Sequence, residues 1–248
     1  MNLRHTTFVA ALALTLGACA TQNPITSTSG VNAAPSPRGW AVQWRGVGSD
    51  TLMKSEIGAT KSLRPLAEAG NMYALGPVSG IKGEIAMWNS DPLMGMVVNG
   101  KPTLVRDPDA HGSWLVWSQV KGWKAVPMPN RSLSYAEINA AVDELASANG
   151  ITDPNMPLPF LMQGKIESAS VHIVNLQDDG KPMTKEKVAI LKTRFHLNNE
   201  TVAVLGFRSS RHSTNPGTIH MHARTADAIY HIDEVKLAPG AVLYLPER

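Results

Sequence analysis

The amino-acid sequence predicts an α+β fold of two β-rich lobes, with mixed or antiparallel sheets and few helices. From Trp40 onward, most of the chain consists of short segments that alternate apolar and polar residues and end at Gly or Pro, which is typical of strands joined by turns. Only one long segment has the period of a helix, and a proline-rich stretch, ITDPNMPLPF, follows it. Hydrophobic residues are 43% of the chain and charged residues 17%, so we expect a packed core.

The first residues are expected to lie outside both lobes. The segment MNLRHTTFVAALALTLGAC has one positive charge, at Arg4, and then an apolar run over 8–16 that is too short for a permanent membrane-spanning helix. This pattern is typical of a secretory signal. The end of the segment, LGAC, resembles the bacterial lipobox, which implies removal of residues 1–18 and lipidation of Cys19. Ordinary secretion with cleavage nearby is the alternative.

Residues 19–38 are predicted to be a flexible tether between the lipid and the folded lobes, because they are rich in Ser, Thr, Asn and Pro. Ala20, which follows the cysteine, does not resemble the aspartate retention signal, and this favours the outer membrane. No second apolar run is long enough to span a membrane. We therefore expect an envelope lipoprotein that faces the periplasm and contacts the membrane only through its lipid.

Cysteine content and charge restrict the chemistry of the folded part. Cys19 is the only cysteine, so its lipidation excludes disulfides and thiolate ligands, and any metal site must be built from His, Asp or Glu. Removal of residues 1–18 takes Arg4 from the 23 Lys and Arg residues and leaves 22, against 20 Asp and Glu. No block of Lys or Arg is present, so we expect no binding to nucleic acid.

The N-terminal lobe is predicted over 39–155. Strands are expected in GWAVQWRGVG, GEIAMW, MGMVVNGKPTLV and SWLVWSQV, and Asn99-Gly100 predicts a hairpin. A short helix is expected over 62–70, with Pro65 in its first turn. The longest helix is expected over 134–149, because Ser134 and Glu137 form a capping-box pattern. Its apolar stripe faces the core and consists of Ile138, Ala141, Val142 and Leu145.

The C-terminal lobe is predicted over 156–248. The segments GKIESASVHIVNL, ETVAVLGFRS, GTIHMHART, AIYHIDEVKL and AVLYLP follow one another at short spacing and are predicted strands. The chain has no GxGxxG or GxxxxGK frame, so no phosphate-binding loop is expected.

Three histidines near the C-terminus predict a metal site. Residues i and i+2 of a strand point to the same face, so His220 and His222 would lie side by side. A tight turn over 225–227 would bring His231 of the next strand to that face. Three neutral imidazoles at one point are typical of a metal site, and zinc is the first choice for nitrogen and oxygen ligands. The alternative is a solvated strand on which the histidines have no such role.

Two blocks of the sequence resemble the acetolactate decarboxylase family, and the resemblance extends over about 60–246. The block VLGFRSSRHSTNPGTIHMHARTADAIYHIDEV resembles the C-terminal part of that family. It carries the matching positions Gly206-Phe207, Pro216-Gly217, His220, His222, and His231 with Asp233. The second block, NMYALGPVSGIKGEIAMWNSD, matches a glycine-rich stretch over 73–76 and places the family's metal-binding glutamate at Glu84.

The resemblance implies a zinc ion held between the lobes by His220, His222, His231 and Glu84. It also implies a zinc-dependent carboxy-lyase that converts acetolactate, or a related 2-hydroxy-3-keto acid, to acetoin. The family is usually dimeric, so a homodimer is a possible state. The competing class is a non-catalytic envelope lipoprotein that retains the zinc site.

The chain departs from the family pattern at three places. His172 stands where the family has an arginine, and we expect it to act as a proton donor or to contact the substrate carboxylate; a pocket-lining histidine with no role is the alternative. Arg194, Arg208 and Arg211 are possible compensating cations. The family's C-terminal tail, which brings another glutamate towards the metal, looks missing, and Glu247 is a poor substitute. The second and third histidines are about two residues closer, which preserves the alternation of faces.

Overall fold

The computed structural model describes residues 32–33, 39–46, 48–177, 179–208 and 219–247. The predicted signal, Cys19 and Arg211 lie outside the described residues. Asn32 and Ala33 belong to the predicted tether, yet they form a short strand that pairs with Trp44 and Gln43. In the described part of the chain, no helix is long and apolar enough to cross a membrane.

The first sheet has seven strands in the order β1-β2-β9-β4-β5-β6-β7, and each neighbouring pair is antiparallel. The strands are β1 (Asn32–Ala33), β2 (Val42–Arg45), β4 (Met72–Pro77), β5 (Glu84–Trp88), β6 (Asp91–Val98), β7 (Lys101–Arg106) and β9 (Leu115–Gln119). Helices α1 (Gly48–Met53) and α2 (Arg64–Ala69) and a ribbon of β3 (Lys61–Ser62) with β8 (His111–Gly112) accompany it. The predicted hairpin at Asn99-Gly100 joins β6 to β7, and both turn residues have positive φ, as such a turn requires.

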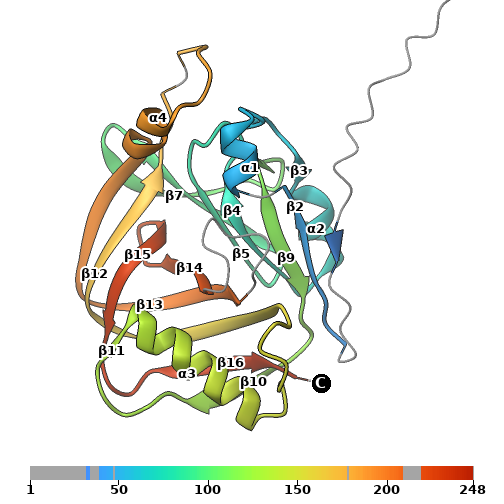
Figure 1. Cartoon of the computed structure of the whole chain (residues 1–248), viewed down its shortest axis with the longest axis vertical. Helices are drawn as coiled ribbons and strands as arrows, with labels where there is room; N and C mark the ends of the chain where they lie inside the picture. Colours follow the sequence, from blue (N-terminus) through green and yellow to red (C-terminus); the bar gives the residue numbers. More distant parts are fainter. Residues whose placement is uncertain (1–31, 34–38, 47, 178, 209–218, 248) are drawn as a thin grey trace, which may run out of the picture.

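The second sheet also has seven strands, in the order β10-β16-β12-β13-β14-β15-β11, and all of its pairs are antiparallel. The strands are β10 (Trp123–Pro127), β11 (Leu133–Ser134), β12 (Leu158–Val174), β13 (Lys192–Arg208), β14 (Ile219–Arg224), β15 (Ile229–Leu237) and β16 (Val242–Pro246). β15 also pairs with β12, so β12, β13, β14 and β15 close into a ring. Figure 1 shows β12 and β13 of this ring as two long, curved strands.

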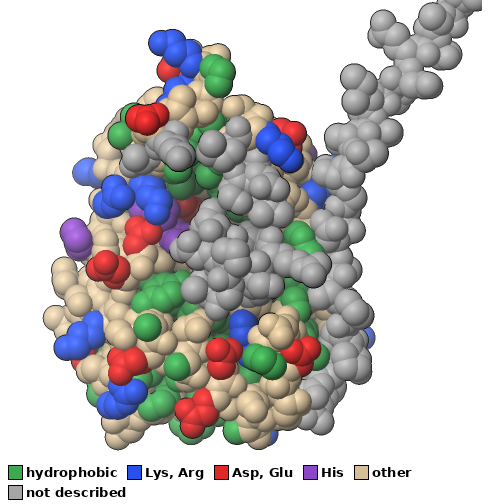
Figure 2. All heavy atoms as spheres, viewed as in Figure 1, with side chains coloured by type: hydrophobic (Ala, Val, Ile, Leu, Met, Phe, Trp, Pro, Cys, Tyr) green, Lys and Arg blue, Asp and Glu red, His purple; other side chains and the backbone are tan. Residues whose placement is uncertain are grey.

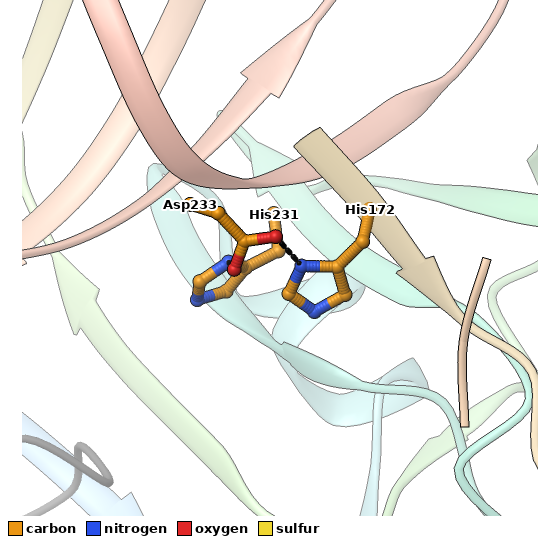
Figure 3. Close-up of side chains that lie close together, drawn as sticks. All are labelled: His172, His231 and Asp233. Carbon is orange, nitrogen blue, oxygen red and sulfur yellow. Dashed lines mark hydrogen bonds and ion pairs between the residues drawn. The ribbon is translucent and has the colours of Figure 1, made fainter. Parts of the chain in front are cut away.

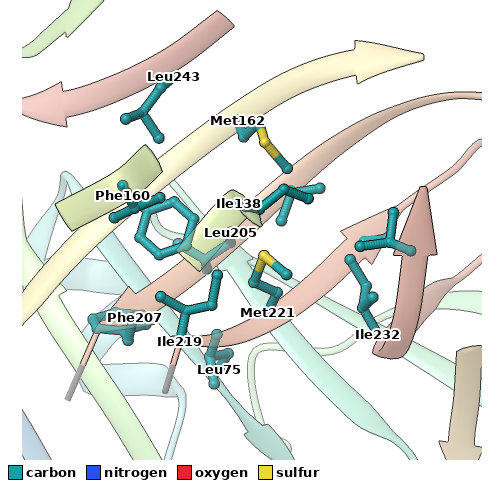
Figure 4. Packing of buried hydrophobic residues seen from close by; sticks show 14 of the residues in the cluster. Leu75, Ile138, Phe160, Met162, Leu205, Phe207, Ile219, Met221, Ile232 and Leu243 are labelled. Atoms are coloured by element: carbon teal, nitrogen blue, oxygen red, sulfur yellow. The ribbon is translucent and has the colours of Figure 1, made fainter. Parts of the chain in front are cut away.

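Helix α3 (Tyr135–Ala148) packs on the second sheet. The backbone N–H of Ser134 donates to Glu137 at 2.8 Å, and the Ser134 hydroxyl accepts from the Glu137 backbone, so both bonds of the predicted capping box are present. Ile138 is fully buried and lies among side chains of β12, β13 and β14 in Figure 4. The short helix α4 (Lys185–Ile190) has Thr184 as its N-cap.

The predicted fold class is confirmed, but the change between sheets does not coincide with the predicted lobe boundary at residue 155. It occurs between β9 and β10, because β10 pairs with β16 along its whole length and β11 pairs with β15. The proline-rich crossover is also shorter than predicted, since β12 already begins at Leu158.

The two sheets touch where β6 meets β15. A Cβ atom on Gly95 would lie 1.8 Å from the carbonyl oxygen of Ile229, so only glycine allows this approach. Ala86, Leu93 and Ile229 form a small buried cluster at the same place. This contact places the N-terminal end of β5 against the ring of the second sheet.

Candidate metal centre

The strand register of the ring brings four histidines together. His231 on β15 pairs with His222 on β14 and also with His172 on β12. His220 lies two residues before His222 on the same face of β14. The ring centroid of His231 lies 4.5 Å from that of His172, 4.9 Å from that of His220 and 5.6 Å from that of His222. The three histidines of the predicted hairpin are therefore together, and a fourth imidazole joins them.

Glu84 faces this group from the other sheet. It is the first residue of β5, and its side chain is 4% exposed. Its Oε2 lies 3.5 Å from His222 Nε2 and its Oε1 lies 3.8 Å from His172 Nε2. The backbone N–H of Val174 donates to Oε1 at 3.2 Å and holds the carboxyl group in place. Glu84 thus lies next to His222, one of the three predicted histidines, and next to His172, the fourth histidine of the cluster.

The protonation of His222 follows from its partner. Its Nδ1 lies 2.8 Å from the carbonyl oxygen of Ile85, and a carbonyl only accepts, so Nδ1 carries the hydrogen and donates. In the neutral ring, Nε2 then presents a lone pair to His220 and Glu84. Such a second hydrogen bond is the usual way in which a protein orients a metal-binding histidine.

The distances around His222 fit a bound metal ion. His222 Nε2 lies 3.2 Å from His220 Nε2, and 3.5 Å from Glu84 Oε2. Two tetrahedral ligands at bond lengths of about 2.0–2.1 Å are separated by about 3.3–3.4 Å. The donor set of imidazole nitrogens and one carboxylate also matches the preferences of zinc.

Among the described residues, His172, His231 and Asp233 form a group that could hold a metal, because their ligand atoms all lie within 4.8 Å of one another. Figure 3 shows the carboxyl group of Asp233 next to both rings, with the far nitrogen of His172 pointing away from it. Asp233 Oδ2 lies 2.7 Å from His172 Nδ1, and Oδ1 lies 3.7 Å from His231 Nδ1. The shorter separation is that of a hydrogen bond, so Asp233 orients His172 and leaves His172 Nε2 directed at Glu84.

Burial determines the charges of these groups. It raises the pKa of Glu84 to about 8 and lowers the pKa of His220 to about 4. Burial also lowers the pKa values of His222 and His231 well below the usual value for histidine. The histidines are therefore neutral at pH 7, which is the form that binds metals.

Burial and the contact between His172 and Asp233 have opposite effects on the pKa values of both residues. Burial lowers the pKa of His172 and outweighs the nearby Asp233, which acts to raise it. Burial acts to raise the pKa of Asp233, but the hydrogen bond and charge of His172, together with Lys192, hold that pKa below its usual value. Asp233 is therefore ionised at neutral pH and accepts the hydrogen of His172 Nδ1.

The cluster opens into a cavity of about 550 Å³. Much of the wall is apolar and includes Ile81, Trp114 and Leu191. The polar groups gather at one part of the wall and are Glu84, Tyr135, His172, Lys192, His220, His231 and Asp233. Figure 2 shows histidine, acidic and basic side chains close together on the face in view. A cavity of this size with a few convergent polar groups is typical of a small-molecule site.

Two of the three arginines considered as compensating cations, Arg194 and Arg208, are described by the structure, and neither lines this cavity. Arg208 is buried, and its guanidinium donates to Asp143 Oδ1 at 2.8 Å and to the carbonyl oxygens of Asp153 and Met156. Arg194 is exposed on β13, and Arg211 lies outside the described residues. Glu247 also lies elsewhere, where its backbone N–H donates to Gly122.

Sequence reasoning missed Lys192, and it named Asp233 as a matching position without giving it a role. Lys192 Nζ donates to Asp233 Oδ1 at 3.0 Å. The strand register could have indicated Lys192, because it pairs with Val174, two residues from His172. That register was not available from local patterns. Asp233 could have been found from its spacing, since it is two residues from His231 and shares its face of β15.

Known structures share this fold. Neither a protein-family model nor a curated protein sequence matches the chain. The alpha-acetolactate decarboxylase of Bacillus subtilis strain 168 superposes with a TM-score of 0.64, at 12% identity over 80% of this chain and 82% of that one. The acetolactate decarboxylase of Bacillus subtilis subspecies spizizenii has a TM-score of 0.60, at 13% identity over 80% and 83% of the two chains.

A protein of unknown function from Staphylococcus aureus, described as similar to alpha-acetolactate decarboxylase, has a TM-score of 0.61, at 14% identity over 79% and 82% of the two chains. The chain therefore has the fold of alpha-acetolactate decarboxylases, and the low identities establish the fold alone.

Proposed function

We propose that the protein is a zinc-dependent carboxy-lyase that decarboxylates acetolactate, or a related 2-hydroxy-3-keto acid, to acetoin or its counterpart. One observation carries the proposal. Glu84 of the first sheet lies 3.5 Å from His222 Nε2, which lies 3.2 Å from His220 Nε2, and these separations fit a single metal ion beside a cavity that Glu84, His220 and His231 line. The likeness in fold to acetolactate decarboxylases supports the same reaction class.

The chemistry requires stabilisation of negative charge. Loss of carbon dioxide leaves an electron pair on C2, which is delocalised onto the neighbouring carbonyl oxygen. A zinc ion bound by the three histidines and Glu84 would supply a Lewis acid for this oxygen. The apolar part of the wall, which includes Ile81 and Trp114, would lower the local dielectric constant and strengthen electrostatic interactions inside the cavity.

After carbon dioxide has left, one proton must be added to C2. We assign this task to His172, whose Nδ1–H is held by Asp233 at 2.7 Å so that Nε2 is available for proton transfer. Because burial lowers the pKa of His172, the ring is neutral at pH 7. His172 Nε2 would therefore take the proton of the substrate hydroxyl and later deliver it to C2, and one proton taken up from water restores the hydroxyl, which gives neutral acetoin.

The test uses the purified protein loaded with zinc and supplied with racemic acetolactate. We expect acetoin in a colour assay and about one zinc per chain by metal analysis. His222→Ala should abolish both acetoin formation and zinc binding, because Nε2 of His222 lies closest to the other donors. His196→Ala is the matched control, since His196 is an exposed histidine on β13 outside the cavity, and it should change neither.

Full zinc occupancy without acetoin would contradict the decarboxylase proposal. That result would favour the non-catalytic envelope lipoprotein that retains the zinc site. Loss of acetoin in His172→Ala with unchanged zinc content would support the assignment of the proton to His172.

A further inference from the structure

The charged side chains that line the cavity are few. They are Glu84, Asp233 and Lys192, and Lys192 is the only Lys or Arg among the described residues of the wall. Two of the arginines considered from the sequence lie elsewhere in the described structure: Arg208 is bonded to Asp143 and two carbonyl oxygens, and Arg194 is exposed outside the cavity.

The position of the Lys192 ammonium is fixed by its neighbours. Nζ donates to Asp233 Oδ1 at 3.0 Å, and the other oxygen of Asp233 is bonded to His172 Nδ1 at 2.7 Å. Both oxygens of Asp233 are therefore engaged, which holds the ammonium next to the imidazole cluster. An ammonium has three N–H groups, so two of those on Lys192 remain for a ligand in the cavity. The Lys192 side chain is 31% exposed, which leaves it accessible from the cavity.

The net charge of the site favours a monoanion. When a divalent metal ion is bound, Glu84 is ionised, so Glu84 and Asp233 contribute two negative charges, Lys192 one positive charge and the metal two, and the sum with neutral histidines is +1. A single carboxylate on the ligand neutralises this charge, whereas a neutral hydroxyketone leaves it uncompensated. Lys192 can supply a charge-assisted hydrogen bond to such a carboxylate.

We infer that Lys192, positioned by Asp233, binds the carboxylate of the substrate and selects 2-hydroxy acids over neutral hydroxyketones. The inference rests on the proposed function, because it assigns a substrate contact in the same cavity. It also has a consequence for turnover. Decarboxylation removes the group that Lys192 binds, so the neutral product loses this contact and leaves the cavity more readily than the substrate does.

The test is isothermal titration of the zinc-loaded protein with two small probes that do not react. The first is 2-hydroxyisobutyrate, which has a hydroxyl and a carboxylate but no ketone, and the second is acetoin, which is neutral. Lys192→Met should weaken binding of 2-hydroxyisobutyrate by roughly 10- to 100-fold, as expected for a hydrogen bond to a charged group. Binding of acetoin should change by less than about 2-fold, and zinc content should be unchanged.

Three further variants separate charge from structure. Lys192→Arg should restore most of the affinity for 2-hydroxyisobutyrate. Lys192→Gln keeps a donor for Asp233 without the charge and should behave like Lys192→Met. Lys236→Met is the matched control, because Lys236 pairs with Glu167 outside the cavity, and it should bind both probes as the unaltered protein does.

Equal binding of 2-hydroxyisobutyrate by the unaltered protein and by Lys192→Met, at equal zinc content, would overturn the inference. Absence of any binding by the unaltered protein would overturn it too. Failure of the decarboxylase proposal gives a different result: Lys192-dependent binding of 2-hydroxyisobutyrate would persist, but acetolactate would not be converted. If both proposals hold, Lys192→Met should raise the KM for acetolactate more than it lowers kcat.

Discussion

Glu84 is the residue at which the chemistry of the site is most sensitive to pH. Its carboxyl group is removed from water and faces two imidazole nitrogens, at 3.5 and 3.8 Å. Burial raises its pKa to about 8, so in metal-free protein it holds a proton at neutral pH. Metal binding requires the ionised form and should therefore release that proton.

For the metal-free protein, we expect the free energy of unfolding to reach a maximum at about pH 6.5. Between about pH 4 and 6.5, stability should rise, because the four buried histidines stay neutral in the folded chain while those of the unfolded chain lose their protons. Between about 6.5 and 8, stability should fall by about 1.4 kcal/mol per pH unit, because only the folded chain keeps the proton on Glu84.

Thermal melting of chelator-treated protein across pH 5–9 measures this profile. Glu84→Gln should remove the fall above pH 6.5 while leaving the rise below it. A melting temperature that keeps increasing between pH 6.5 and 8 in the unaltered protein would contradict the assignment to Glu84.

Asp233 allows the two possible metal groups to be distinguished. Its 2.7 Å bond to His172 Nδ1 indicates an orienting carboxylate and not a ligand. Asp233→Asn should therefore lower decarboxylase activity by about 10- to 100-fold and leave one zinc per chain. Metal analysis beside the acetoin assay checks this, and loss of zinc would place the metal in the His172, His231 and Asp233 group instead.

At the scale of elements, the ring of β12, β13, β14 and β15 is what assembles the site. β15 pairs with β14 on one side and with β12 on the other, so His231 has a histidine opposite it on both strands. Register shifts in β12 near Ile166 and Ser170 accompany the bend that closes the ring. A shift of one residue in either pairing would direct the histidines to the opposite face of the sheet.

Gly95 on β6 controls how closely the first sheet approaches this ring. Gly95→Ala should destabilise the protein by about 1–3 kcal/mol or more, because the new Cβ would meet the Ile229 carbonyl oxygen at 1.8 Å. It should also lower zinc occupancy, since Ile229 precedes His231 by two residues. Chemical denaturation and metal analysis measure both effects. Gly58→Ala is the control, because a Cβ there meets nothing within 4 Å, and equal stability of the two variants would contradict the role of Gly95.

At the scale of the whole molecule, the cellular location remains a proposal based on the sequence. We propose that lipid on Cys19 anchors the protein to the periplasmic side of the outer membrane. Cys19→Ser should move the protein from the membrane fraction to the soluble fraction of the cell envelope, because it removes the thiol to which the lipid would be attached. Fractionation followed by immunoblotting measures this, and unchanged partitioning would refute lipidation.

The sequence by itself determined the local features of this protein. The capping pattern at Ser134 and Glu137 and its apolar stripe located α3, and Asn99-Gly100 located a hairpin. The two-residue period placed His220 and His222 on one face. Each of these depends on interactions between residues that are near one another in the chain, so a short segment carries the whole signal.

Only the tertiary structure decided which distant segments meet. The pairing of β12 with β15 places His172 beside His231, and the pairing of β12 with β13 brings Lys192 to the cavity, where it is the one Lys or Arg among the described lining residues. β10 and β11 join the second sheet by pairing with β16 and β15, which lie about a hundred residues further along the chain. Such pairings depend on burial and register across the whole molecule, and no local pattern of residues encodes them.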